Sequence, residues 1–392
     1  MRVVLLVIDS FGIGSMSDAA EYGDEGANTA LHICETVPGE KWPNLKRLGL
    51  GNASAILGAD LPGCSAVSSP LASFGVMAER SPGKDTTTGH WELAGIVLDQ
   101  PFPTFPPEYP SFPADLVDAF GRKTGKGMLG NCAASGTAII QALGDKHMAT
   151  GDPIVYTSSD SVFQIAAHEE VIPIDDLYSM CTMARELCDP YQVARVIARP
   201  FVGGEGEFTR TERRRDFSMP PFHDTVLDFL AASGVETIGI GKIGDIFCEQ
   251  GLVTSYHDKG NTACLARTRS VLAETAADDR FVFVNLVDTD MNFGHRRDPV
   301  GYLRAVEEID TALPSLMDHI DDDDILIISA DHGCDPTFPG SDHTREHVPL
   351  LWYSKSREPV SLGTREQFCD VARSIAANFV SEALPDGELL FP

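Results

Sequence analysis

The feature that most constrains the fold is a set of short, uninterrupted apolar runs. There are four, each bounded by polar or turn-forming residues: 2–9 (RVVLLVID), 235–242 (VETIGIGK), 281–290 (FVFVNLVDTD) and 324–333 (DILIISADHG). A strand that is apolar at every position is buried on both faces, which is typical of parallel sheets covered by helices. Helical patterns at 262–277 and 301–319 separate some of these runs. The sequence therefore predicts an α/β protein with a mostly parallel central sheet flanked by helices.

Two segments interrupt this alternation. Residues 101–113 are rich in proline, and residues 199–222 are rich in glycine, proline and charge. The stretch that they bracket has the size of a small domain. We therefore expect a discontinuous core formed by residues 1–100 and 220–392, with an inserted α+β cap domain at 101–219. A single domain with two long loops is the alternative.

The charge balance limits the possible partners. With 30 basic and 58 acidic residues the net charge is −28, so nucleic acids and anionic membranes would be repelled. No apolar run is long enough to span a bilayer, and the first residues do not resemble a signal peptide. Nine scattered cysteines without a CxxC pair are typical of reduced thiols. We expect a cytoplasmic enzyme in which metals, or grouped Arg and Lys, make the site for an anionic substrate locally positive.

Acidic residues and histidines collect where three of the apolar runs end. They are Asp9 after the first run, Asp288, Asp290 and His295 after the third, and Asp331, His332 and His343 after the fourth. Parallel strands present their carboxyl ends at one edge of a sheet. A single such Asp is ordinary in a turn or helix cap, but three such ends, two of them with nearby histidines, indicate a metal centre. Mixed oxygen and nitrogen ligands without cysteine suit two divalent cations, Mn²⁺ foremost, with Mg²⁺ or Zn²⁺ as alternatives.

The run GKDTTTGHWE at 83–92 supplies a candidate nucleophile. A hydroxyl beside a divalent cation loses its proton more readily and becomes nucleophilic. A helix is predicted to begin here, and its N-terminal amides favour a phosphate. The alternative is that the threonines only cap this helix, a role that we expect of Thr88. A P-loop is excluded, because Ala78 and Asp85 stand where that motif needs Gly and Ser or Thr.

Several motifs carry a resemblance to a known family. They are VIDSFGIG, GKDTTTGHWE, VYTSSDSVFQIAAHEE, VIARPFVG, FTRT, IGKIGDIF, FGHRRDP and ADHGCDP…GSDHTREHVPLL. Together they resemble the phosphopentomutases of the alkaline phosphatase superfamily, over nearly the whole chain. VID and ADHG are common in that superfamily, whereas GKDTxTGHWE, GHRRDP and DHTREHVPLL are specific. The resemblance implies an alkaline-phosphatase-like core with an inserted cap.

The resemblance also implies roles for individual residues. One cation would be held by Asp290, His295 and His343, and the other by Asp9, Asp331 and His332. Thr86 follows the Lys-Asp pair directly, which is where that family carries its phosphorylated threonine, and its oxygen would face the second cation. The implied substrate-binding residues are Asp160, Arg195, Arg210 and Lys242. For each Arg or Lys, an ordinary surface ion pair is the alternative.

The implied reaction interconverts ribose 1-phosphate and ribose 5-phosphate, and the 2-deoxyribose pair, in nucleoside and pentose salvage. It would proceed through phosphorylated Thr86 and a sugar 1,5-bisphosphate, with a sugar bisphosphate also acting as primer. The alternatives are a phosphatase, a cofactor-independent phosphoglycerate mutase and a non-catalytic sugar-phosphate sensor. Two residues depart from the common family pattern, Thr87 and Cys334, and Cys334 beside the metal ligands predicts sensitivity to oxidation or soft metals.

Overall fold

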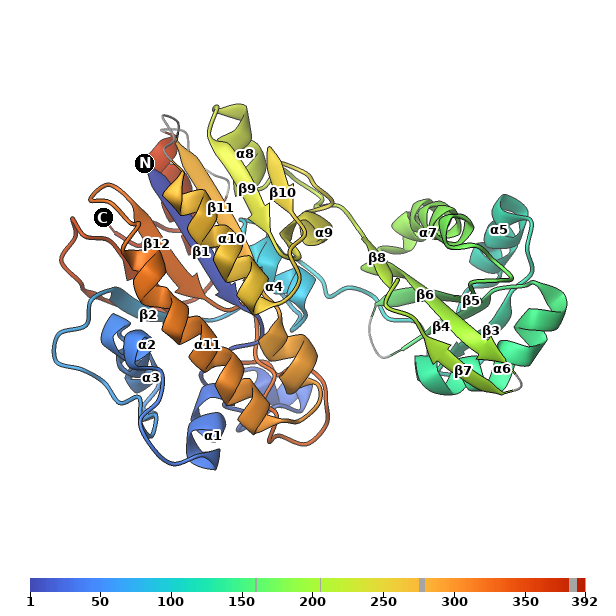
Figure 1. Ribbon diagram of the computed structural model, residues 1–392, viewed down its shortest axis with the longest axis horizontal. Coiled ribbons are helices and arrows are strands. Elements are labelled where there is room, and N and C mark those ends of the chain that lie inside the picture. The colour runs from blue at the N-terminus through green and yellow to red at the C-terminus, as the bar shows by residue number, and fades with distance from the viewer. Residues whose placement is uncertain (159–160, 205, 275–278, 381–385, 392) are drawn as a thin grey trace. The chain divides into compact units, whose positions relative to one another are not determined.

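The structure is a computed structural model that divides the chain into two compact units. It describes all residues except 159–160, 205, 275–278, 381–385 and 392. The first unit comprises Met1–Pro101 and Pro221–Pro392, and the second comprises Phe102–Pro220. Each unit has its own sheet (Figure 1). No described helix combines the length and hydropathy that crossing a bilayer requires.

The first unit is built on an eight-stranded sheet in the order β10-β9-β11-β1-β12-β13-β2-β14. In that order the strands are Thr254–Tyr256, Glu236–Ile240, Arg280–Leu286, Arg2–Ile8, Ile325–Ser329, Val348–Tyr353, Ser73–Met77 and Ser361–Arg365. Only β13 runs antiparallel to its neighbours, and every other pairing is parallel. The predicted mostly parallel α/β core is confirmed.

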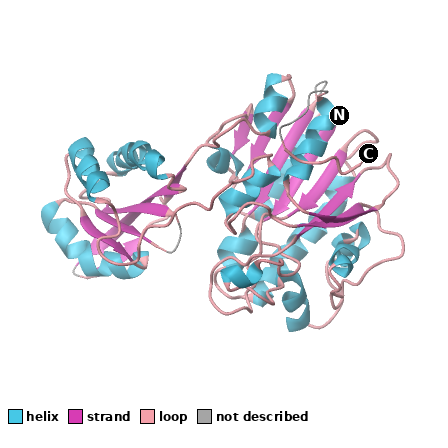
Figure 2. Cartoon of the chain, turned by 180° about the vertical axis from the view of Figure 1, so that it is seen from behind, coloured by secondary structure: helices cyan, strands magenta, loops and turns pink. Residues whose placement is uncertain are grey.

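Helices cover both faces of this sheet. They are α1 (Thr29–Thr36), α2 (Pro43–Leu48), α3 (Leu50–Ile56), α4 (Thr86–Leu93), α8 (Val226–Ala232), α9 (Ile243–Phe247), α10 (Asn261–Ala273), α11 (Pro299–Met317) and α12 (Cys369–Phe379). Helices α10 and α11 lie on one face and α4 lies on the other (Figures 1 and 2). Helix α12 packs against α4 and α8. With helices on both sides, the central strands have no polar face, which is why their sequences are largely apolar.

The third apolar run leaves the sheet earlier than predicted. A strand was expected over 281–290, but β11 ends at Leu286 and a short π-helix, Thr289–Gly294, follows. The Thr289 hydroxyl donates to the backbone oxygens of Asp9, at 2.6 Å, and Leu286, at 3.3 Å. These bonds turn the chain at the strand end, so Asp290 reaches the sheet edge from a helical turn.

The second unit has a sheet in the order β3-β4-β5-β6-β7, with β8 also paired to β6. Its strands are Leu129–Ala133, Ile154–Thr157, Val162–His168, Arg195–Gly204, Glu207–Arg210 and Arg215–Ser218, and its helices are α5 (Ala114–Thr124), α6 (Gly136–Thr150) and α7 (Ile174–Cys188). Residues 101–113 form neither helix nor strand. Residues 199–222, which were expected to interrupt the alternation of strands and helices, complete β6 and form β7 and β8. Charge is tolerated on β7 because only Phe208 is buried there.

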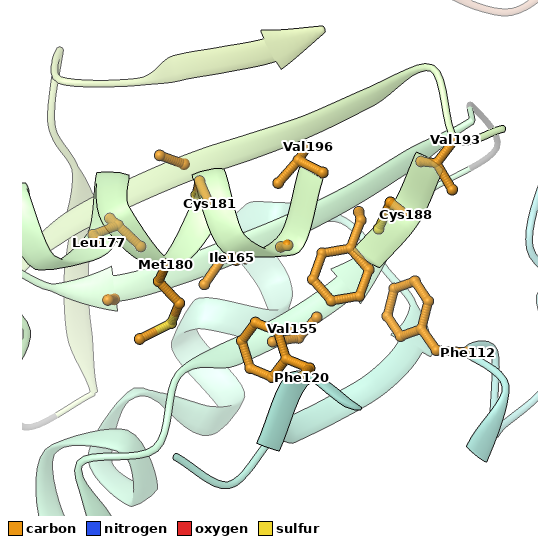
Figure 3. Close-up of a cluster of buried hydrophobic side chains, with 14 of the residues drawn as sticks. Phe112, Phe120, Val155, Ile165, Leu177, Met180, Cys181, Cys188, Val193 and Val196 are labelled. Carbon is orange, nitrogen blue, oxygen red and sulfur yellow. The ribbon is translucent and has the colours of Figure 1, made fainter. Parts of the chain in front are cut away.

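A buried apolar cluster holds α5 and α7 against one face of the second sheet (Figure 3). Phe120 of α5 is fully buried, and its ring centroid lies 5.7 Å from that of Phe163 on β5. Close-packed interiors do not refill the space left by a deleted ring. The cluster is therefore expected to dominate the stability of this unit.

Phe120→Ala is expected to lower the free energy of unfolding of the second unit by about 3–5 kcal/mol. Urea unfolding followed by circular dichroism measures the change. Met148→Ala on α6 is the control, because Met148 is 38% exposed and a surface substitution changes stability by roughly 0.5 kcal/mol or less. Equal losses for the two variants would contradict the assigned packing.

Candidate active site

Three adjacent strands bring acidic residues to the same edge of the first sheet. Strand β1 lies between β11 and β12, with Ile8 paired to Leu286 and Val7 paired to Ser329. These strands therefore end at nearly the same level, and Asp9, Asp290 and Asp331 follow their carboxyl ends. All three carboxylates are buried. Such an edge is where ligands bind in open α/β sheets.

One group of candidate ligands consists of Asp9, Asp331 and His332, whose ligand atoms lie within 4.8 Å of one another. His332 Nε2 is 3.3 Å from Asp331 Oδ2 and 3.7 Å from Asp9 Oδ1. Thr86 Oγ1 lies 3.3 Å from the same Nε2 atom. The predicted nucleophile therefore lies beside this group.

The second group is centred on Asp290. Its Oδ1 lies 3.2 Å from His343 Nε2, and its Oδ2 lies 3.5 Å from His295 Nε2. The His343 and His332 ring centroids are 3.9 Å apart, so the two groups are contiguous. Cys334 was left out of the predicted ligands, but the structure places it within ligand reach of Asp290 and His295.

Two imidazoles are oriented as metal ligands usually are. His295 Nδ1 donates to the Ser341 carbonyl at 2.7 Å, and His332 Nδ1 donates to the Gly333 carbonyl at 3.0 Å. Each bond selects the tautomer whose Nε2 lone pair faces the carboxylates. A backbone carbonyl commonly holds a metal-bound histidine in this way.

The carboxylates have oxygens that the described residues leave without a hydrogen bond. Asp9 Oδ1, Asp290 Oδ1 and Asp331 Oδ2 are buried and accept none there. Burial and the neighbouring Asp331 and Asp290 carboxylates raise the pKa of Asp9 to about 7. Burial disfavours ionised Asp331 as well, but His332 and His90 outweigh it and lower its pKa to about 2. A divalent cation would coordinate such unpaired oxygens and offset the repulsion between the crowded carboxylates. The donor set therefore fits metal binding.

The threonine run forms the start of α4. Asp85 is the N-cap, and its Oδ1 accepts from the backbone nitrogens of Thr87, at 3.0 Å, and Thr88, at 3.2 Å. The prediction that Thr88 caps this helix is wrong, because the Thr88 hydroxyl instead donates to Asp85 Oδ2 at 2.5 Å. Thr87 and Thr88 are buried, whereas Thr86 is half-buried. Thr86 is therefore partly exposed, and its hydroxyl also contacts His332. His332 belongs to the acid and histidine cluster, by which we mean Asp9, Asp290, His295, Asp331, His332 and His343.

Two residues that sequence reasoning did not assign support this arrangement. His90 Nδ1 lies 2.9 Å from the Thr86 carbonyl and 3.1 Å from Asp331 Oδ2. Asn285, within β11, donates to Asp9 Oδ2 at 2.8 Å. The spacing of His90 four residues after Thr86 places both on one helix face, and this was the signal that could have assigned His90.

Comparison with known proteins gives a family for this site. The Metalloenzyme superfamily matches residues 1–383. A phosphopentomutase of Anaeromyxobacter sp. (strain K) is 52% identical over 379 residues, covering 96% of this chain and 95% of its own. A phosphopentomutase of Thermotoga petrophila is 49% identical over 390 residues, covering 99% and 98%. The chain belongs to the phosphopentomutase family. It is accordingly a mutase, and so an isomerase.

Among solved structures the similarity is weaker. A Leishmania mexicana phosphoglycerate mutase is 13% identical, with a TM-score of 0.46, and covers 99% of this chain and 96% of its own. This similarity is too low to bear on the function of this family member.

The predicted substrate residues fall in both units of this phosphopentomutase family member. Lys242 directly precedes α9, and its positive charge lowers the pKa of Asp9. Arg195 begins β6 and lies 3.6 Å from Asp216 Oδ2, while Arg210 ends β7 and is exposed. Asp160 lies outside the described residues.

Two further polar residues of the second unit, Tyr156 and Arg199, lie near Arg210. The Tyr156 hydroxyl is buried and has no hydrogen-bond partner among the described residues. A Cβ on Gly136, at the start of α6, would lie 2.4 Å from that hydroxyl and 3.5 Å from Arg210 Nη1. Burial and nearby Arg214 lower the pKa of Arg199 to about 10. The sequence hinted at Arg199, because it lies four residues after Arg195 and so on the same face of β6.

Gly89 lets α4 approach the candidate metal centre. A Cβ on this residue would lie 2.1 Å from the Asp331 carbonyl oxygen and 2.9 Å from the Asp331 Cβ. These distances are shorter than van der Waals contact, so a larger residue must push α4 away from the end of β12.

Gly89→Ala is expected to lower mutase activity by about 100-fold, because the shift of α4 carries Thr86, on the same helix as Gly89, away from His332. Steady-state kinetics measure the loss. Gly121→Ala is the control, because the nearest atom to its Cβ is the Lys126 carbonyl oxygen at 3.5 Å. That variant is expected to keep full activity and to gain up to about 1 kcal/mol in stability. Full activity in Gly89→Ala would show that the close contact does not matter.

Proposed function

We propose that this chain interconverts ribose 1-phosphate and ribose 5-phosphate, and the 2-deoxyribose pair, with Thr86 as the phosphoryl carrier. The observation that carries the proposal is the half-buried Thr86 hydroxyl, 3.3 Å from His332 at the start of α4. The names of relatives at about 50% identity support the substrate class. Nucleoside and pentose salvage in the cytoplasm is the proposed setting.

The six acids and histidines are proposed to hold two divalent cations, most favourably Mn²⁺. Asp290, His295 and His343 would hold one, and Asp9, Asp331 and His332 would hold the other, beside Thr86. When bound, the cations would make the Thr86 hydroxyl more acidic and neutralise charge on the transferring phosphoryl group. Carboxylate and imidazole ligands of this kind suit Mn²⁺.

The chain's own groups are proposed to position the phosphoryl group. Thr86 is the first residue of α4, so the free amides of that helix end favour a phosphate on its hydroxyl. Lys242, which follows β9, adds positive charge near Asp9. Asp160, Arg195 and Arg210 remain predicted residues for the sugar phosphate, because Arg binds phosphate through paired hydrogen bonds and Asp binds sugar hydroxyls.

The proposed reaction has two balanced transfers. The phosphoryl group passes from Thr86 Oγ1 to the free hydroxyl of the sugar monophosphate: the Thr86 O–P bond breaks, the sugar O–P bond forms, and the proton lost by the sugar hydroxyl ends on Thr86 Oγ1. The resulting 1,5-bisphosphate returns its other phosphoryl group to Thr86, which regenerates the phosphorylated enzyme and the isomeric sugar phosphate. Exclusion of water from phosphorylated Thr86 separates such a mutase from a phosphatase.

A coupled assay tests this proposal. Purified protein with Mn²⁺ receives ribose 1-phosphate and a trace of ribose 1,5-bisphosphate, and both ribose 5-phosphate and inorganic phosphate are measured. Ribose 5-phosphate as the main product is expected, with a mass increase of one phosphoryl group on Thr86. Inorganic phosphate as the main product would favour a phosphatase, and no phosphorylation with no turnover would favour a sensor.

A further inference from the structure

Arg345 is a buried cation whose hydrogen bonds end on the segment that leads to Thr86. The residue is 3% exposed. Its Nη1 donates to the backbone carbonyls of Ser81, at 2.8 Å, and Gly83, at 2.5 Å. Its Nη2 donates to the Glu79 carbonyl at 2.7 Å. One guanidinium therefore holds three backbone carbonyls of residues 79–83.

Two carboxylates keep this guanidinium charged. Glu79 Oε2 accepts from Nη1 at 2.7 Å, and Asp18 Oδ2 accepts from Nη2 at 3.0 Å. Burial alone would lower the pKa of Arg345, but Glu79 and Asp18 outweigh it and raise the pKa. A planar fork with five donors can serve carboxylates and carbonyls in several directions at once, which the single ammonium of lysine cannot do.

A second tether joins the same two parts of the chain. Lys84 Nζ lies 3.0 Å from Asp24 Oδ2 and 3.5 Å from Asp342 Oδ2. Asp24 Oδ2 also accepts from the Arg345 backbone nitrogen at 2.9 Å. The threonine loop, residues 79–86, is therefore bonded to residues 342–345 both before Lys84 and at Lys84.

Residues 342–345 also carry one of the candidate metal ligands. His343 lies two residues before Arg345, and its Nε2 is 3.2 Å from Asp290 Oδ1. A short stretch of chain thus provides a group of the acid and histidine cluster together with the clamp on the threonine loop. A shift of this stretch would move both together.

We propose that Arg345 is a positioning residue that keeps the Thr86 hydroxyl in place against the acid and histidine cluster. The inference rests on the proposed function, because it concerns the rate at which Thr86 accepts a phosphoryl group. Arg345 makes its contacts with the chain itself, so its loss is expected to lower kcat and to leave KM nearly unchanged.

The test measures phosphoryl transfer to Thr86 in a single turnover. Dephosphorylated full-length protein with Mn²⁺ is mixed with ribose 1,5-bisphosphate, and mass spectrometry gives both the rate constant and the final phosphorylated fraction. In Arg345→Lys the charge near Glu79 and Asp18 remains, but the three carbonyl contacts cannot all be made. We expect a rate constant about 100-fold below wild type with the same final fraction.

A second variant separates positioning from loss of fold. Arg345→Met combined with Glu79→Gln removes both charges, so no buried carboxylate is left without its partner. It is expected to react as slowly as Arg345→Lys. Arg280→Met is the matched control, because Arg280 is 9% exposed and donates to Glu236 and Glu274. It is the first residue of β11, so it lies at the amino ends of the strands, away from the candidate site. The Arg280→Met variant is expected to react at the wild-type rate.

The outcomes are distinguishable. A wild-type rate constant in both Arg345 variants, or a smaller phosphorylated fraction that forms at the wild-type rate constant, would overturn the positioning role. Wild-type protein that takes up no phosphate at Thr86 would refute the proposed function, and the inference with it. An equally slow Arg280→Met variant would also overturn the inference, since the effect would then not depend on the threonine loop.

Discussion

Thr86→Val is expected to abolish mutase activity, lowering kcat/KM by at least about 10⁴-fold, as loss of a covalent nucleophile does in other enzymes. Valine keeps the branched shape of threonine and removes only the hydroxyl that lies 3.3 Å from His332. Without that hydroxyl no phosphoryl group can be carried between the two sugar positions. The coupled assay with ribose 1-phosphate, Mn²⁺ and a bisphosphate primer measures the loss.

Thr87→Val is the matched control for this prediction. Thr87 is the next residue of the same helix turn, but it is 4% exposed, whereas Thr86 is half-buried. We expect activity within about threefold of wild type, since removing a hydroxyl without a chemical role changes little. Equal activity of the two valine variants, or phosphate on Thr87 in wild-type protein, would move the nucleophile away from Thr86.

Asp290→Asn is expected to cause the second large loss, about 10³-fold in activity, with loss of bound metal. Asp290 is 4% exposed, and its two carboxylate oxygens lie 3.2 Å from His343 Nε2 and 3.5 Å from His295 Nε2. The amide keeps the size of the side chain but removes the charge that a divalent cation requires. Metal content after dialysis and steady-state kinetics measure the two effects separately.

Asp288→Asn tests whether position or mere acidity matters. Asp288 follows the same strand two residues earlier, but its Oδ2 accepts from the Asn261 backbone nitrogen, at the start of α10, at 2.8 Å. Asparagine can also accept that bond, so we expect nearly unchanged activity and metal content. If Asp288→Asn loses metal and Asp290→Asn does not, the proposed ligand set is wrong.

The two acids also show how far sequence reasoning reached. Both follow an apolar run, so the sequence placed both at the sheet edge. Two residues along a helical turn point in nearly opposite directions, roughly 200° apart. At the π-helix after Leu286, Asp290 accordingly lies beside the histidines, while Asp288 accepts from the first backbone nitrogen of α10. That helix was not predicted, because the turn that begins it is held by a bond from the Thr289 hydroxyl to the backbone oxygen of Asp9, which lies 280 positions earlier in the chain, just after β1.

The threonine run shows the same limit. Its composition indicated a nucleophile and a helix start, and the resemblance favoured Thr86. The cap was assigned to Thr88, although Asp85 supplies it. Both are ordinary capping residues, and only the backbone path into α4 chooses between them.

The sequence by itself determined the class of fold and the set of side chains available for chemistry. Strands buried on both faces are largely apolar, so acidic residues collect where such strands end, and Asp9, Asp290 and Asp331 could be picked out as candidates from the chain alone. Only the tertiary structure decided which hydroxyl faces the cluster and how Arg345 holds the threonine loop. Those contacts join residues more than two hundred positions apart, and a single guanidinium reaches its carbonyls only after the loops have packed around it.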